Sequence, residues 1–200
     1  MTRIIGLTGG IASGKSTVSD LLGQAGWPIV DADQVSRQVQ RPGSLGLSRL
    51  VATFGSQILL PNGQLDRATL GRRVFGDDNA RQQLNAIMQP LIWDAIWQKV
   101  ASLKQAKVPD VILDVPLLFE QHYDQDCDLI IVVAVSQKVE LHRLMQRNGY
   151  PKSVAQARIK AQLPLAKKVQ QADFVIDNNG SLKATRRQVA QLVEDLRRTR

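Results

Sequence analysis

Five short runs of apolar residues along the chain predict buried β-strands. They cover residues 3–7, 28–30, 111–113, 129–135 and 174–176, and the fourth run, LIIVVAV, is the strongest. Each run is nearly continuous in apolar residues, which is typical of strands that are buried on both faces of a parallel sheet. Helical spacing follows the first run, because Val18, Leu21, Leu22 and Ala25 recur every three or four positions before Gly26. The pattern predicts an α/β fold with a five-stranded parallel sheet flanked by helices.

The stretch between the second and third strands, about residues 36–108, has helical spacing and no convincing strand. Its longest apolar stripe runs from Leu84 to Leu103 and contains Pro90. Because proline lacks the N–H that a helix interior needs, we expect one helix to end there and another to begin. We therefore expect a core made of residues 1–35 and 109–200 with a helical insertion at 36–108. That insertion is either a substrate-binding lobe or an additional packing layer.

Composition narrows the class of protein. The 200 residues are 44% hydrophobic, which suits one domain with a sizeable insertion, and no apolar run approaches the ~18 residues of a membrane span. The single cysteine, Cys127, cannot form an internal disulfide, so we expect a cytoplasmic protein. The net charge of +8 is compatible with binding nucleic acid, an anionic membrane surface or phosphate-rich small molecules. No aromatic residues are interleaved with the basic ones, which weakens the interpretation as a single-strand nucleic-acid binder.

The segment GGIASGKST, residues 9–17, predicts a loop that binds the phosphates of a nucleotide. It lies between the first apolar strand and an amphipathic helix, as such loops do. Glycines let backbone N–H groups converge on an anion at a helix N-terminus. Lys15 can reach the β- and γ-phosphates, and the Ser16 hydroxyl can bind Mg²⁺. The predicted nucleotide-binding residues of the loop are Gly10, Ile11, Ala12, Ser13, Gly14, Lys15, Ser16 and Thr17.

The loop alone does not distinguish hydrolysis, switching and transfer of the γ-phosphate. No asparagine in the chain is followed by lysine, so the Asn-Lys-x-Asp motif of GTPases is missing. The third strand ends at Asp114 and continues with Val115, without the adjacent glutamate of many ATPases. These features favour transfer to a bound acceptor. A regulatory protein that binds a nucleotide, and nucleic acid through its positive charge, is the alternative.

Two carboxylates mark the end of the second strand. Asp31 and Asp33 flank Ala32, at the sheet edge where ligands bind in open α/β folds. Asp33 can orient an acceptor hydroxyl and accept its proton, and Arg37, one helical turn later, can bind a phosphate of the acceptor. The alternative role for Asp33 is a helix N-cap.

A basic segment follows the strongest strand. Arg143 and Arg147 lie one helical turn apart, and Arg158 lies on a second short helix after the Gly-Tyr-Pro sequence at 149–151. Such a segment can close over a triphosphate and stabilise charge at the transferring phosphoryl group. The alternative is a solvated cationic face.

The chain resembles the dephospho-CoA kinase family along its whole length. The resemblance rests on IIGLTGGIASGKS, VDADQVSRQVQRPGS, LDVPLLFE, QRNG, RIKAQ and ADFVIDNNG. It implies transfer of the γ-phosphate of ATP to the 3′-hydroxyl of the ribose of dephospho-CoA, giving CoA and ADP, with ATP and Mg²⁺ as the bound cofactors. It also implies a P-loop kinase fold with a CoA-binding helical lobe and a helical lid at about 148–170. Other small-molecule P-loop kinases, such as relatives of shikimate or nucleoside kinases, are the runner-up.

The resemblance also implies roles for single residues. Asp33 is similar in position to the family's residue that contacts the 3′-hydroxyl and acts as the base. Lys15 and Arg147, with Arg143 as a helper, resemble the groups that stabilise the migrating phosphoryl group. The implied substrate-binding residues are Asp33, Arg37, Pro116, Leu117 and Arg158, and the residues implied to meet the adenine of ATP are Asn178 and Asn179.

Three positions depart from the family pattern. Ala12 stands where the family often has glycine, and Asn85 and Gln89 stand where it commonly has glutamate and histidine. The expected partner is dephospho-CoA, without nucleic acid or membrane, in a monomer or weak homo-oligomer.

Overall fold

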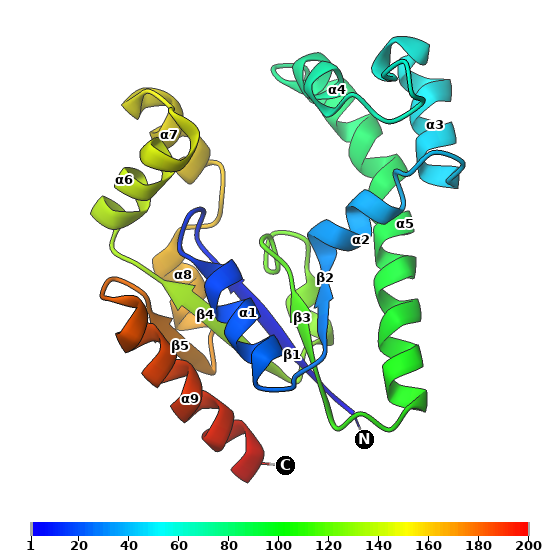
Figure 1. The fold of residues 1–200 in the computed structure, drawn as a ribbon. Helices are drawn as coiled ribbons and strands as arrows, with labels where there is room; N and C mark the ends of the chain where they lie inside the picture. The colour runs from blue at the N-terminus through cyan, green and yellow to red at the C-terminus, as the bar shows by residue number, and fades with distance from the viewer. Residues whose placement is uncertain (1, 200) are drawn as a thin grey trace. The chain divides into compact units, whose positions relative to one another are not determined.

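The computed structural model describes residues 2–199 and has the predicted α/β core. The strands are β1 (Arg3–Gly9), β2 (Ile29–Asp31), β3 (Asp110–Asp114), β4 (Leu129–Ala134) and β5 (Phe174–Asp177). They form a parallel sheet in the order β2-β3-β1-β4-β5, as Figure 1 shows. All five predicted strands are confirmed, each within two residues of its expected bounds. β1, which leads into the glycine-rich loop, is the central strand.

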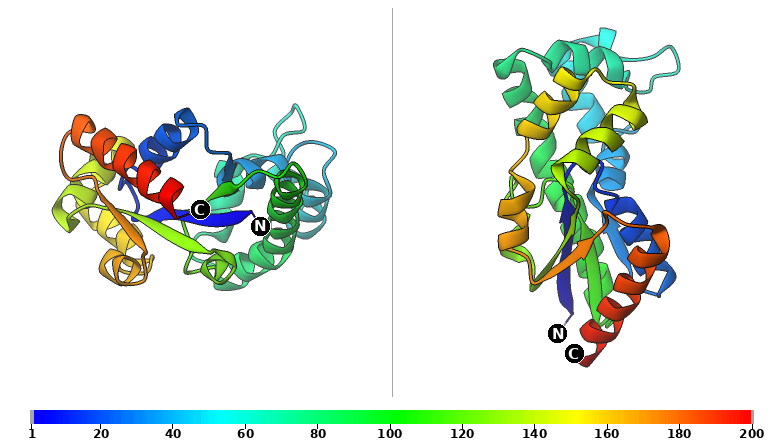
Figure 2. Two further views of the ribbon diagram at one scale, coloured as in Figure 1. Left: turned by 90° about the horizontal axis from the view of Figure 1, so that it is seen from below. Right: turned by 90° about the vertical axis from the view of Figure 1, so that its left-hand side faces the viewer.

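Helices cover both faces of this sheet. Those of the core are α1 (Lys15–Gln24), α6 (Gln137–Asn148), α7 (Lys152–Lys160), α8 (Leu165–Gln170) and α9 (Leu182–Arg198), with a short 3₁₀ turn η2 (Tyr123–Asp126). α1 and α9 pack together on one face, and α8 lies against β4 on the other (Figure 2). The main core lies between the sheet and the helices α1 and α9, where Leu22 and Leu196 are buried against Ile5 and Ile131. Strands that are apolar on both faces need this two-sided cover.

The chain divides into two compact units. The first contains the residues up to Val30 and those from Leu103 onward, and the second contains Asp31–Ser102. The second unit is built from α2 (Ala32–Gln38), α3 (Leu45–Phe54), α4 (Arg67–Val74) and α5 (Asp78–Gln105), with a 3₁₀ turn η1 (Ser56–Ile58). It has a hydrophobic core of its own, in which Leu50 and Ile58 are fully buried.

The expected helix break at Pro90 is wrong. α5 runs without interruption from Asp78 to Gln105 with Pro90 inside it. Pro90 itself is exposed, whereas Met88, Ile96 and Val100 on the same helix are buried. A proline on the outer face of a helix interrupts one backbone hydrogen bond where water can replace it. Burial of the apolar side chains on both sides of Pro90 offsets that loss.

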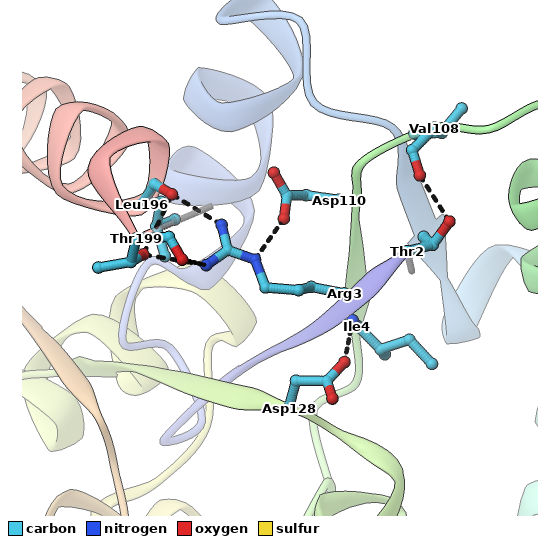
Figure 3. A network of polar contacts seen from close by, with 8 residues as sticks. All are labelled: Thr2, Arg3, Ile4, Val108, Asp110, Asp128, Leu196 and Thr199. Carbon is cyan, nitrogen blue, oxygen red and sulfur yellow. Dashed lines mark hydrogen bonds and ion pairs between the residues drawn. The ribbon is translucent and has the colours of Figure 1, made fainter.

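A hydrogen-bond network ties the start of β1 to the end of α9 (Figure 3). Arg3 Nε contacts Asp110 Oδ1 at 2.6 Å, and its Nη2 donates to the carbonyl oxygen of Leu196 at 2.7 Å. Arg3 Nη1 donates to both oxygens of Thr199, at 2.9 Å to Oγ1 and 3.0 Å to the carbonyl. Asp110 is only 1% exposed, so its charge depends on partners such as this guanidinium.

We expect Arg3→Met to destabilise the fold. Methionine fills part of the same space but leaves the buried Asp110 without the guanidinium, which costs about 2–3 kcal/mol. The corresponding fall in Tm is roughly 5–10 °C and is measurable by differential scanning calorimetry. Arg197→Met is the matched control. The Arg197–Glu194 pair is 3.5 Å long and half exposed on both sides, so its loss should change stability by less than about 0.5 kcal/mol. Equal effects of the two substitutions would contradict the prediction.

The single cysteine lies beside the sheet. Cys127 Sγ donates to the carbonyl oxygen of Tyr123 at 3.3 Å. Burial, and then the nearby Asp126, Asp124 and Asp128, raise the pKa of the Cys127 thiol to about 12. The thiol is therefore protonated at neutral pH.

No helix within residues 2–199 is long and apolar enough to span a membrane.

Candidate active site

The phosphate loop connects the central strand to α1. β1 ends at Gly9 and α1 begins at Lys15. Gly14 has a φ of +89°, in the left-handed region that favours glycine, and a Cβ at this position would clash with the side-chain amide of Asn178. Both constraints require glycine here. The motif's second glycine therefore lets the loop turn into the helix while Asn178 lies against it.

The N-terminus of α1 is open to an anion. No side chain caps this helix. The Ser13 hydroxyl is buried and has no hydrogen-bond partner in the part of the chain that the structure describes. Backbone amides at a helix N-terminus together with an unpaired buried hydroxyl suit a bound phosphate. The geometry is therefore compatible with a nucleotide on residues 10–17.

Ala12 has an unusual backbone conformation for a residue with a side chain. Its φ is +58°, in the left-handed region, although it is not glycine. This conformation costs an L-residue about 1–2 kcal/mol relative to the right-handed one. The departure from the family's glycine at this position therefore has a conformational cost.

We expect Ala12→Gly to raise stability. The strain is relieved and partly offset by the greater freedom of glycine in the unfolded chain, which leaves a gain of up to about 1 kcal/mol. Tm should rise by roughly 2–4 °C. Ala25→Gly is the control, because Ala25 has a φ of −79° and gains nothing from glycine. Ala25→Gly should lower Tm, and a fall in Tm for both variants would refute the argument about strain.

Lys15 is paired with a carboxylate at the end of the neighbouring strand. Lys15 Nζ contacts Asp114 Oδ1, and the two side chains are 19% and 3% exposed. Asp114 closes β3, which pairs with β1 in parallel, so both groups lie at the carboxyl edge of the sheet. The loop lysine is therefore held at the edge where ligands bind in open α/β sheets.

Two further predicted residues lie next to the loop: Asn178, directly after β5, and Arg143 on α6. Asn178 Nδ2 donates to the carbonyl oxygen of Ser13 at 2.7 Å, and its Oδ1 accepts from the Thr185 hydroxyl at 2.6 Å. Arg143 Nη2 donates to the backbone oxygen of Asn178 at 3.0 Å, and its Nη1 lies 3.8 Å from the position of a Cβ on Gly14. The structure thus brings these two predicted site residues to the phosphate loop.

The other predicted residues of this region lie elsewhere. Arg147 is exposed and donates from Nε to Asn148 Oδ1 at 2.9 Å. The Arg158 guanidinium lies over the ring of Tyr150, 4.7 Å from its centroid. Asn179 Oδ1 accepts from the backbone N–H of Ser136 at 2.7 Å. None of these contacts reaches the phosphate loop in this structure.

Glu140 is a buried carboxyl group next to the loop. It is 5% exposed, and its Oε1 lies so close to Gly10 that a Cβ on that residue would clash with it. Burial raises the pKa of Glu140 above its ordinary value, and Lys168 counteracts this in part.

A separate pocket of about 410 Å³ lies within the second unit. Its lining combines two arginines and an aspartate with an apolar wall: Asp33, Ser36, Arg37, Gln40, Leu65, Arg67, Leu70, Gly71, Val74 and Leu84. Arg67 Nη2 donates to Gln40 Oε1 at 3.1 Å, which orients the arginine. This lining suits a ligand that has both an anionic and an apolar part.

The alternative role of Asp33 as an N-cap is wrong. α2 begins at Ala32, and Asp31 is its N-cap, with Oδ1 accepting from the backbone N–H of Gln34 at 3.0 Å. Asp33 lies in the first turn, is exposed and faces the pocket of the second unit. Helix capping therefore does not occupy the carboxylate of Asp33, and the group can contact a ligand.

Asp114, Arg67 and Lys168 make contacts near the predicted sites, although the sequence motifs do not single them out. A signal for Asp114 exists, because it ends a buried strand as Asp31 does. Arg67 and Lys168 have no such local signal. Arg67 contacts Gln40, 27 residues away in the sequence, and Lys168 contacts Glu120, 48 residues away.

The fold and the loop together define a P-loop kinase: a parallel sheet, a phosphate loop between its central strand and α1, and a paired loop lysine. A sequence profile described as Dephospho-CoA kinase matches residues 3–184. The chain belongs to the dephospho-CoA kinase family.

Relatives and a solved structure agree with this assignment. The chain is 47% identical to a dephospho-CoA kinase of Arabidopsis thaliana, over 98% of this chain and 84% of the relative. It is 46% identical to one of Geobacillus kaustophilus, over 97% and 96%. The crystal structure of a dephospho-CoA kinase from Campylobacter jejuni has a TM-score of 0.76 at 26% identity, with 98% of both chains covered.

Proposed function

We propose that the protein transfers the γ-phosphate of ATP to the 3′-hydroxyl of the ribose of dephospho-CoA, giving CoA and ADP. This is the last step of coenzyme A biosynthesis. The observation that supports the proposal most is the position of Lys15, which contacts Asp114 at the edge of the sheet where ligands bind. It occurs in a chain that matches the dephospho-CoA kinase family over residues 3–184. The positive net charge of +8 fits a protein whose two substrates both carry phosphates.

The donor phosphates bind to the loop in this proposal. Backbone N–H groups at the start of α1, among them those of Lys15 and Ser16, bind the β-phosphate, and Lys15 exchanges its contact with Asp114 for the β- and γ-phosphates. Arg143, already beside the loop, stabilises the charge of the transferring group. Arg147 does so as well once its side chain leaves Asn148.

Mg²⁺ is the second component that the residues can hold. The Ser16 hydroxyl is exposed at the start of α1, and Asp114 offers a carboxylate at the end of β3. Hydroxyl and carboxylate oxygens are the ligands that Mg²⁺ prefers. When bound, the ion neutralises charge on the β- and γ-phosphates.

The acceptor is assigned to the pocket of the second unit in this proposal. Arg37 and Arg67 bind phosphates of dephospho-CoA in the pocket of the second unit, and Asp33 orients the 3′-hydroxyl. Pro116 and Leu117, half-buried after β3 in the first unit, stay predicted substrate-binding residues. We propose α7, with Arg158, as the part of the lid that moves, because only Ala155 of this helix is buried.

An ADP-release assay with the purified protein tests the function. Dephospho-CoA, shikimate, AMP and adenosine are supplied in turn with ATP and Mg²⁺, and one reaction has no acceptor. We expect release only with dephospho-CoA, and a product that mass spectrometry and nuclear magnetic resonance identify as phosphorylated on the 3′-hydroxyl. ADP release that does not depend on the acceptor contradicts the proposal. The cytoplasmic location, the monomer or weak homo-oligomer and the lack of nucleic-acid binding remain predictions.

A further inference from the structure

Lys168 is a buried cation that the proposed chemistry does not use. It lies on α8 and its side chain is 0% exposed. Its Nζ forms an ion pair with Glu120 Oε1 at 2.9 Å and lies 3.4 Å from the carbonyl oxygens of both Gly9 and Pro116. An ammonium group has three N–H donors, and these are three acceptors. Each donor therefore has its own partner.

The three acceptors belong to different parts of the expected active site. Gly9 ends β1 and begins the phosphate loop, whereas Pro116 and Glu120 bound the segment after β3 that contains the proposed substrate-binding residues Pro116 and Leu117. The carbonyl oxygen of Pro116 also accepts from the Thr8 hydroxyl at 3.0 Å, which is a second link to β1. Lys168 thus connects the donor side of the first unit to its acceptor side.

The connection between α7 and α8 is attached at the same place. Glu120 Oε1, the oxygen that contacts Lys168, also accepts from the backbone N–H of Leu163 at 2.9 Å. Gln162 Oε1 accepts from the backbone N–H of Ile11 in the phosphate loop at 3.1 Å. The chain that follows α7 is therefore fixed both to the loop and to the segment after β3.

Stability alone does not explain a lysine in this position. Removing two charges from water costs several kcal/mol, and well-packed apolar side chains are often as stable or more stable than a buried ion pair. A role in aligning the two substrates does explain a buried lysine at this position. Phosphoryl transfer depends on alignment of donor and acceptor, and a misplacement of about 1 Å can cost about 100-fold in rate.

We propose that Lys168 is a positioning residue: through Gly9, Pro116 and Glu120 it sets the distance between the phosphate loop and the segment 116–120. It acts on the alignment of the two substrates and not on the affinity for either one. The inference rests on the proposed function, since it assigns Lys168 a part in that transfer.

The test compares Lys168→Met with Lys167→Met. Lys167 is the exposed neighbour on the same helix, so its replacement changes net charge equally without touching the network. Calorimetry gives the separate affinities for ADP and dephospho-CoA, circular dichroism gives the folded fraction, and ADP release gives kcat. We expect Lys168→Met to lower kcat between about 10- and 100-fold with both affinities within about threefold of wild type. Lys167→Met should match wild type throughout.

Two results overturn the inference. One is an unchanged kcat in folded Lys168→Met, and the other is a loss that the folded fraction or weakened ADP binding explains in full. If Lys168→Met does not fold, Glu120→Gln takes its place, because it keeps the shape of the side chain and removes the charge that Lys168 meets. The same kcat and affinity criteria then apply. Wild-type turnover of dephospho-CoA is measured first, so failure of the proposed function is seen independently of either variant.

Discussion

Replacing Lys15 by methionine should lower kcat by about 100- to 1,000-fold, the range seen when one group that stabilises transition-state charge is removed. Methionine keeps most of the length and apolar stem of lysine, so the substitution removes mainly the charge. That charge lies at the start of α1, where Lys15 Nζ contacts Asp114 Oδ1. The initial rate of ADP release with saturating dephospho-CoA measures the effect.

The control for Lys15 is another lysine. Lys183 is exposed on α9, and Lys183→Met should leave kcat unchanged. Urea denaturation of each variant separates a catalytic effect from a loss of folded protein, because Lys15→Met also removes a partner of the buried Asp114. A folded Lys15→Met enzyme with kcat within threefold of wild type rules out the assigned role of the loop lysine.

Asp33→Asn should lower kcat by roughly 100-fold or more, as expected when a general base is lost. The amide is nearly the same size and still accepts a hydrogen bond, but it does not take up the proton of the acceptor hydroxyl. Because Asp31 and not Asp33 caps α2, the free energy of unfolding should stay within about 0.5 kcal/mol of wild type. Acceptor-dependent ADP release and urea denaturation on the same preparation test both statements.

Variants of two other aspartates serve as controls for this experiment. Asp20→Asn, on the exposed side of α1, should alter neither activity nor stability. Asp31→Ala should lower stability by about 1 kcal/mol through loss of the N-cap. If Asp33→Asn destabilises the protein and leaves kcat intact, Asp33 is a structural residue and the base lies elsewhere.

The core elements could be predicted because their signals are local. An apolar run, a glycine-rich loop and a helical stripe follow one another within residues 3–26, and the structure places β1, the loop and α1 there. The same holds for β4, whose seven-residue run is the strongest in the sequence. Strands of this kind are recognisable because burial on both faces demands apolar residues at successive positions.

Pro90 shows where a local rule fails. The rule counts the cost of proline inside a helix but not the packing of that helix. In α5 the proline is exposed while Met88 and Ile96 are buried, so tertiary contacts on the opposite side maintain the helix through it. A single sequence does not reveal which side of the stripe faces the core of the second unit.

The contacts around the phosphate loop could not be predicted, because they join residues far apart in the chain. Lys15 meets Asp114 across 99 positions, and Asn178 meets Ser13 across 165. The local sequence draws attention to each of these residues but does not indicate which residue is its partner. Strand order brings them together, since β3 and β4 both flank β1 and β5 follows β4.

The high pKa of Cys127 makes its thiol a reporter of unfolding. Only the thiolate reacts with alkylating reagents, and a pKa of about 12 in the folded protein leaves very little of it at neutral pH. In the unfolded chain the pKa returns to near 8.5, so the reactive fraction rises by roughly three orders of magnitude. Because it is the single cysteine, the rate of alkylation follows the opening of the sheet around η2 and β4 without any engineered label.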